Sequence, residues 1–181
     1  MRLTILILVL TVFGLAGWAC RPGTGNSMRT GNVALQASLK VKNPYYSRTD
    51  TTTLNLPDSV WKQVLPDSIY ETARNKDTER AFTGKFWNFT GIGTYYCAAC
   101  GNKLFRSDAK FASTCGWPSF FEPSRKNSVK YLDDNSYGME RIEVLCGRCG
   151  GHLGHLFDDG PPPTGKRYCM NSIVLDFEPG K

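Results

Sequence analysis

The chain has 181 residues, of which 41% are hydrophobic and 21% charged, and this composition predicts one globular domain with some additional sequence. The formal net charge is +6, but six basic residues and one acid lie in the first 56 positions, which leaves 16 basic and 15 acidic residues afterwards. A nucleic-acid-binding domain needs clustered positive charge on its folded part, so the distribution argues against a nucleic-acid partner.

Residues 1–20 have the pattern of an export signal. Arg2 precedes the short apolar run "LTILILVLTVFGLA", and small residues follow it. The pair Ala19-Cys20 indicates a lipoprotein signal with a lipid anchor at Cys20, although the preceding "GW" matches a lipobox imperfectly. Plain cleavage after Ala19 and an uncleaved anchor are the alternatives. We expect a periplasmic protein or membrane-anchored lipoprotein of a bacterium, in a compartment where cysteines tend to oxidise.

Residues 21–55 are rich in Gly, Ser, Asn and Pro at their start, and we interpret them as a flexible tether. The domain is predicted to occupy residues 56–181. It opens with "LPDSVWKQVLPDSIYETAR", in which Asp58 or Ser59 can cap a first short helix. The second "LPDS" ends the first helix and predicts the start of a second short helix.

The remainder of the domain has a sequence pattern typical of antiparallel β-strands. Short runs of β-branched and aromatic residues are separated by Gly, Asn, Asp and Pro, as in "GTYYCAACGNKLF", "SVKYLDD", "RIEVLC" and "SIVLDF". The stretch "DDGPPPTGK" predicts an irregular loop before the last strand. The predicted fold class is therefore mainly β, with antiparallel sheets and short N-terminal helices.

Four cysteines form two C-x-x-C pairs, Cys97 with Cys100 and Cys146 with Cys149. Two intervening residues let both thiolates of a pair bind one tetrahedral ion from a tight turn, so the doublet predicts a structural Zn²⁺ site. Disulfides or a thioredoxin-like redox centre are the alternatives. A redox C-x-x-C usually opens a helix after a strand in a βαβ unit, and that pattern is missing here.

The segment "RYCMNS" carries a further cysteine between two polar residues. In an extended segment Arg167, Cys169 and Asn171 share one face. A guanidinium beside a thiol lowers the thiol pKa, which predicts a reactive thiolate at Cys169. The alternative is a buried structural cysteine, but burying Arg167 beside it would be costly.

The histidines and the last unpaired cysteine of the domain lie in two other motifs. His152 and His155, in "GHLGHLF" directly after the second cysteine pair, are candidates for handling protons. Cys115 lies in the Gly/Pro turn "STCGWPSF", which could bring a second thiol to the first. Trp117 in the same turn either packs in the core or forms the wall of an apolar pocket.

Five motifs in order resemble the B-type methionine sulfoxide reductases: "TERAFTGKFW", "GTYYCAACG", "CGWPSFFEP", "CGRCGGHLGHLFDDGP" and "RYCMNSIVLDF". The resemblance covers roughly residues 56–179. It implies a β-tent domain with a structural zinc site apart from the catalytic centre. Thr114 and Ile173-Val174 depart from many relatives and bear on the shape of the pocket.

The resemblance also implies roles by position. Cys169 would attack the substrate, Cys115 would resolve the intermediate, and Trp117 with Phe157 would hold the substrate methyl group. The polar side of the site would consist of His152, His155, Asp159, Arg167 and Asn171.

The implied reaction reduces methionine-R-sulfoxide, free or in oxidised proteins under repair. It passes through a cysteine sulfenic acid and an intramolecular disulfide, and a thioredoxin-like reductant recycles the enzyme. His155 is the first choice as proton donor, with Asp159 and Asn171 orienting it or a bound water. We expect a monomer. The other function classes are a zinc-ribbon interaction module and a general thiol–disulfide oxidoreductase.

Overall fold

The computed structural model describes residues 42–180. The predicted signal, Cys20 and the tether up to residue 41 lie outside the described residues. Within residues 42–180, no helix is long and apolar enough to cross a membrane.

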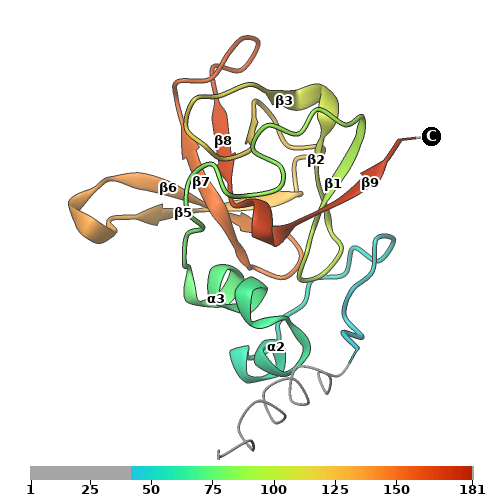
Figure 1. Cartoon of the computed structure of the whole chain (residues 1–181). Coiled ribbons are helices and arrows are strands. Elements are labelled where there is room, and N and C mark those ends of the chain that lie inside the picture. The colour runs from blue at the N-terminus through green and yellow to red at the C-terminus, as the bar shows by residue number, and fades with distance from the viewer. Residues whose placement is uncertain (1–41, 181) are drawn as a thin grey trace, which may run out of the picture. The chain divides into compact units, whose positions relative to one another are not determined.

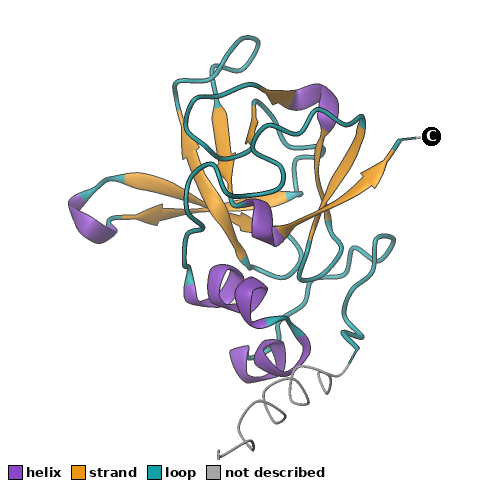
Figure 2. Ribbon diagram, in the orientation of Figure 1, coloured by secondary structure: helices purple, strands orange, loops and turns teal. Residues whose placement is uncertain are grey.

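Two antiparallel sheets form the body of the domain (Figures 1 and 2), which confirms the predicted fold class. The smaller sheet has the order β2-β1-β9, and the larger has the order β3-β4-β8-β7-β6-β5. The smaller sheet contains β1 (Gly93–Cys97), β2 (Lys103–Arg106) and β9 (Leu175–Pro179). The larger sheet contains β3 (Lys110–Phe111), β4 (Ser119–Phe120), β5 (Val129–Asp134), β6 (Arg141–Cys146), β7 (His152–Phe157) and β8 (Arg167–Met170). Short 3₁₀ helices occupy η1 (Ser107–Ala109), η2 (Ser136–Gly138) and η3 (Ser172–Val174).

Two short helices precede the sheets, as the sequence predicted: α2 (Asp58–Val64) and α3 (Asp67–Asn75). A proline stands directly before each, where a missing backbone N–H costs nothing. The helices bury Trp61, Tyr70 and Ala73, and they lie together at one end of the sheets in Figure 1. Helices this short are marginal alone, so this buried face stabilises them.

Aromatic side chains from both sheets form the centre of the core. Tyr95 of β1, Phe105 of β2 and Phe120 of β4 are fully buried. The Phe105 and Phe120 rings stack with centroids 4.4 Å apart, and Tyr95 meets Phe120 edge-on at 5.0 Å. Large aromatic rings dominate the energetics of such cores, so this contact joins the two sheets into one unit.

The last predicted strand begins later than expected. The run "SIVLDF" predicted extended chain from Ser172, but η3 occupies the first three residues and β9 starts at Leu175. The carboxylate of Glu79 accepts hydrogen bonds from the backbone N–H groups of Ser172 at 2.5 Å and Ile173 at 3.1 Å. This distant side chain satisfies the first donors of the 3₁₀ turn, a partner that local propensity does not reveal.

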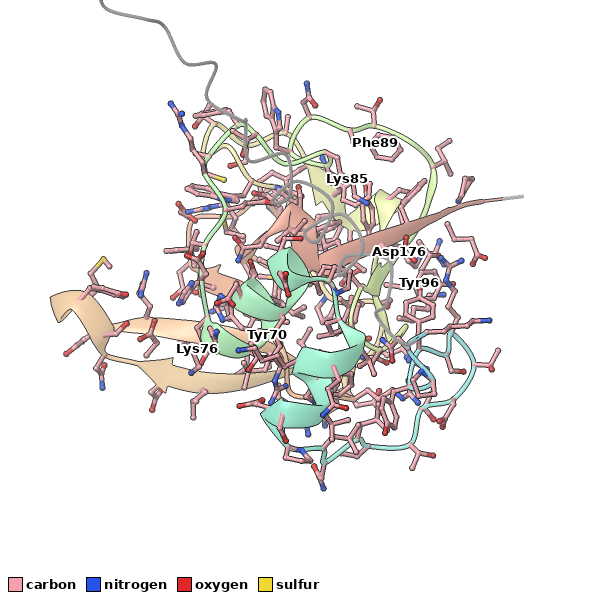
Figure 3. The ribbon with its side chains drawn as sticks, turned by 60° about the horizontal axis from the view of Figure 1, so that its bottom comes forward. Tyr70, Lys76, Lys85, Phe89, Tyr96 and Asp176 are labelled. Carbon is pink, nitrogen blue, oxygen red and sulfur yellow. The ribbon has the colours of Figure 1, made fainter. Side chains whose placement is uncertain are left out.

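Part of the predicted tether is folded onto the domain. We call residues 43–54 the N-terminal strap. Arg48 of the strap pairs with Asp176 at 2.7 Å and Glu178 at 2.8 Å, and its guanidinium lies 4.7 Å from the Tyr96 ring centroid. Figure 3 shows Tyr96 and Asp176 side by side where the strap passes. The folded chain therefore begins before residue 56, the predicted start of the domain.

Arg148, in the second C-x-x-C turn, holds the strap on both sides of Arg48. Its buried guanidinium donates to the carbonyl oxygens of Tyr45 and Thr52 at 3.0 and 3.1 Å, and to that of Cys100. It also pairs with the Asp50 carboxylate at 2.6 Å. The strap in turn passes so close to Gly101 that a Cβ there would lie 2.6 Å from a backbone oxygen of the strap.

We expect Arg148→Met to lower the free energy of unfolding by about 3 kcal/mol, because it leaves buried carbonyl oxygens without a donor. The measurement is urea unfolding of the metal-loaded protein. Arg106→Met is the matched control, since Arg106 forms only an exposed pair with Asp108 and its loss should leave the free energy of unfolding nearly unchanged. Equal losses in the two variants would contradict the strap's dependence on Arg148.

Candidate active site and metal centre

The four cysteines of the two C-x-x-C pairs converge on one buried point. Their sulfur atoms all lie within 4.8 Å of one another. The closest approaches run between the two pairs: Cys97 to Cys149 at 3.8 Å and Cys100 to Cys146 at 3.6 Å. A tetrahedral ion with metal–sulfur bonds of about 2.3 Å requires sulfur atoms about 3.8 Å apart. The cluster therefore fits a four-thiolate metal site.

The chemistry of this donor set also favours a metal. The three neighbouring thiols, together with burial, hold the pKa of Cys97 well above its usual range. Four thiolates in such a space need a cation to balance them. Each pair lies in a turn after a strand, β1 or β6, and no helix opens at either one. A thioredoxin-like redox centre would need such a helix. Strand β7 follows the second turn, so the cluster fixes the place where β7 begins.

The larger sheet aligns the reactive side chains in one row. Strand pairing sets Ser119 of β4 opposite Cys169 of β8, Cys169 opposite His155 of β7, and His155 opposite Glu143 of β6. Residues directly opposite each other in antiparallel strands share a face, with Cβ atoms about 4.5–5.5 Å apart. The neighbouring row of Phe120, Tyr168 and Leu156 faces the core. His155 and His152 both lie on strand β7.

Cys115 and Cys169 meet across this face. Their sulfur atoms are 3.5 Å apart, and neither forms a disulfide. Cys115 lies in the turn before β4, where Gly116 takes φ +89. A Cβ at Gly116 would lie 2.8 Å from the Ala81 side chain, so only glycine fits. The geometry brings together the two cysteines that the sequence analysis singled out.

The two thiols have opposite tendencies to ionise. Burial works against the Cys115 thiolate, but hydrogen bonds from Ser113 and Ser119 and contact with Cys169 outweigh it and lower its pKa to about 7. Burial, and then the neighbouring Cys115, raise the pKa of Cys169 to about 12. Arg167 acts on Cys169 in the predicted direction but is outweighed. The predicted lowering of the Cys169 pKa is therefore not found, because burial and Cys115 outweigh Arg167: the pair loses one proton readily and holds the second.

Arg167 is fixed by two neighbours. It donates two hydrogen bonds to the Asp159 carboxylate, at 2.7 and 2.8 Å, and this bidentate pair orients the guanidinium. Its Cζ lies 4.4 Å from the centroid of the Phe157 ring, its cross-strand partner. Asp159 therefore orients Arg167, whereas we expected it to orient His155 or a bound water.

The hydrogen-bond partners of both histidines are carboxylates that the sequence analysis missed. His155 Nε2 lies 2.8 Å from Asp134 Oδ2, and His152 Nδ1 lies 2.7 Å from Glu143 Oε1. Asn171 is not among these partners. Its side chain accepts from the backbone N–H of residue 79 and donates to the carbonyl of residue 153. The "SVKYLDD" and "RIEVLC" strands carried these acids, but only cross-strand register shows which histidine each one meets.

Glu79 is a further site residue that sequence reasoning missed. Its backbone carbonyl accepts the indole N–H of Trp117 at 3.1 Å, and its N–H donates to Asn171 at 3.1 Å. Its carboxylate binds the start of η3. One residue therefore links the half-buried indole to the end of the strand that carries Cys169. The motif "TERAFTGKFW" contained it, without a sign of this role.

Two unbonded thiols 3.5 Å apart, one of them ionising near neutral pH, can close into a disulfide and reopen. That chemistry defines a thiol-dependent oxidoreductase with a separate four-cysteine metal site.

Comparison with known proteins gives the family. The family model described as SelR domain matches residues 65–179. The peptide methionine sulfoxide reductase MsrB of Agrobacterium fabrum is 51% identical over 126 residues, which cover 70% of this chain and 93% of that protein. The protein of the same name from Leptospira interrogans is 52% identical, with 69% and 95% covered, and that from Methanosarcina barkeri is 53% identical, with 65% and 83% covered. The chain belongs to the SelR-domain family, the peptide methionine sulfoxide reductases MsrB.

We expect alkylation of the reduced protein by iodoacetamide to rise through a transition near pH 7, because thiolate forms as pH rises through the Cys115 pKa of about 7. Mass spectrometry of the labelled peptides measures it for each cysteine. Cys169→Ser should keep the transition and Cys115→Ser should lose it. The reverse pattern would show that Cys169 carries the low pKa.

Proposed function

We propose that this protein reduces methionine-R-sulfoxide to methionine in the repair of oxidised proteins. The observation that carries the proposal is the pair of free thiols, Cys115 and Cys169, 3.5 Å apart on a face that also holds a histidine. Membership of the SelR-domain family supports the reaction.

Substrate binding is assigned to the apolar side of this face. A methyl sulfoxide side chain is half apolar, and an indole edge or face can hold its methyl group. Trp117 is half-buried, and its hydrogen bond to the Glu79 carbonyl fixes the ring. Phe157, whose ring centroid lies 4.4 Å from Arg167 Cζ, is the second apolar residue assigned to substrate binding.

Attack requires the Cys169 thiolate, since the thiol is a poor nucleophile. The first proton leaves the pair near neutral pH, and the sulfur atoms are close enough to exchange the one that remains. Transfer of that proton from Cys169 to Cys115 places the charge on Cys169, where the Arg167 guanidinium stabilises it. Burial keeps the population of the Cys169 thiolate low until substrate binds, and this protects Cys169 from other oxidants.

The reaction then proceeds in three balanced steps. The Cys169 thiolate attacks the sulfoxide sulfur, the oxygen takes a proton from His155, and methionine leaves with Cys169 as sulfenic acid. The Cys115 thiol condenses with the sulfenic acid, which forms the disulfide and releases water. A thioredoxin-type dithiol then reduces the disulfide by exchange and is itself oxidised.

Zinc is the metal we assign to the four-cysteine cluster, because four thiolates in tetrahedral arrangement are its preferred structural site. When bound, it supplies structural crosslinking and no reaction step. The ion would be held by Cys97 and Cys100 at the end of β1 and by Cys146 and Cys149 at the end of β6. It would thereby join the smaller sheet to the larger one.

We expect the protein to reduce the R epimer of a blocked methionine sulfoxide and to leave the S epimer unchanged, as measured by chromatography of the separated epimers. Cys169→Ser should abolish the activity, because no nucleophile remains. Cys115→Ser should form one methionine per chain and then turn over poorly with thioredoxin. Residual turnover in the first variant, or normal cycling in the second, would contradict the assigned roles.

We expect one zinc ion per chain, measured by elemental analysis of the purified protein. Cys146→Ser should lose the metal and lower the thermal unfolding temperature, since structural zinc binding contributes directly to folding. Cys115→Ser is the control and should keep a full complement. A metal-free wild-type protein with an unchanged unfolding temperature would argue against the zinc site.

A further inference from the structure

Asp134 is a carboxylate with every hydrogen bond committed to its own hairpin and one histidine. It ends β5 in the β5–β6 hairpin, which projects from the larger sheet in Figure 1. Its Oδ1 accepts the backbone N–H of Ser136 at 3.0 Å, and its Oδ2 accepts Arg141 Nη2 at 2.7 Å. His155 Nε2 lies 2.8 Å from the same Oδ2. The carboxylate is therefore held in place before it meets the histidine.

This contact decides which nitrogen of His155 carries hydrogen. Hydrogen bonds from Ser136, and then from His155, keep the pKa of Asp134 well below its usual range, so the carboxylate stays an anion that can only accept. Nε2 must then be the donor. The nitrogen left for the reacting atoms is Nδ1, the one nearer the backbone, on a residue directly opposite Cys169.

The tautomer has a consequence for proton transfer. With hydrogen fixed on Nε2, the neutral ring offers only a lone pair at Nδ1. His155 can donate from Nδ1 only as the imidazolium, in which both nitrogens carry hydrogen. In the proposed reaction both nitrogens therefore carry hydrogen before the ring donates, with the Asp134 carboxylate accepting from Nε2.

His152 has the opposite arrangement in the same polar pocket. The pocket has a volume of about 510 Å³ and is lined by both histidines, Asp134, Glu143, Arg141 and Lys76, among others. His152 is 3% exposed, and burial lowers its pKa, so the ring is neutral. Its Nδ1 bonds Glu143, whose other oxygen accepts Lys76 at 2.8 Å. Figure 3 shows Lys76 at the end of α3 beside the hairpin.

The unequal surroundings separate the two histidines chemically. The neutral His152 keeps its hydrogen on Nδ1 toward Glu143, and its Nε2 has no hydrogen-bond partner among the described residues. It is an acceptor. His155 is 16% exposed, and its Nε2–H donates to a carboxylate that also binds Arg141.

We propose that Asp134 is a positioning residue for the reductase reaction: it holds Nε2–H of His155 and so presents Nδ1 of that ring to the substrate oxygen above Cys169. The inference rests on the proposed function, in which His155 donates the proton. The same inference gives Arg141 an indirect positioning role, because Arg141 binds the Asp134 oxygen that His155 contacts.

The test compares Asp134→Asn with Asp133→Asn in the reduced, zinc-loaded protein. Both variants remove one negative charge from adjacent positions of β5, but Asp133 is exposed and alternates to the other face. We expect Asp134→Asn to slow single-turnover formation of methionine about 10- to 100-fold with KM within about twofold of wild type. Asp133→Asn should match the wild type.

Nitrogen-15 NMR of the histidine rings supplies a readout that a loss of packing would not mimic. Wild-type His155 should show hydrogen on Nε2, and Asp134→Asn should give a mixture of tautomers. Unchanged turnover in Asp134→Asn, or a slower enzyme whose His155 ring keeps its wild-type signals, would overturn the inference. If the wild-type protein itself fails to reduce the R-sulfoxide, the proposed function falls, and the ring signals still decide whether Asp134 fixes the tautomer.

Discussion

The register of β8 between β4 and β7 is the constraint on which the site depends. It sets Cys169 between Ser119 and His155 and turns the aromatic row beside it into the core. Because side chains alternate along a strand, a slip of one residue would bury Cys169 and expose Tyr168. The Tyr168 ring of β8 packs against Phe105 with centroids 5.7 Å apart and opposes such a slip, so the packing of the core also fixes the position of Cys169.

The four-cysteine cluster and the N-terminal strap secure the ends of the two sheets. The cluster joins the turns after β1 and β6, and the second of these turns leads directly into the strand that carries both histidines. Arg148 connects the same turn to the strap, whose contacting residues lie 98 and 103 positions away in sequence. One end of the face that carries Cys169 is thus tied to the four-cysteine cluster, whereas its other border is the turn that carries Cys115.

Much of this could be predicted from local patterns. Period-two spacing placed Arg167 and Cys169 on one face, paired C-x-x-C motifs predicted the cluster of four cysteines, and repeated "LPDS" segments marked the helices. The failures share a physical cause. The carboxylate on His155, the cap on η3 and the anchor of the strap all depend on partners far along the chain. The pKa of Cys169 was misjudged because sequence shows a neighbouring charge but not the extent of burial.

The spacing of Cys115 and Trp117 has a consequence for the catalytic cycle. Only Gly116 separates them, and the indole is pinned to Glu79. In the proposed cycle the disulfide brings the two sulfur atoms from 3.5 Å to about 2.05 Å, and Cys115 moves beside the tryptophan. The oxidised form would then differ from the reduced form next to the residue assigned to the substrate methyl group. Substrate and reductant would therefore meet two distinct surfaces.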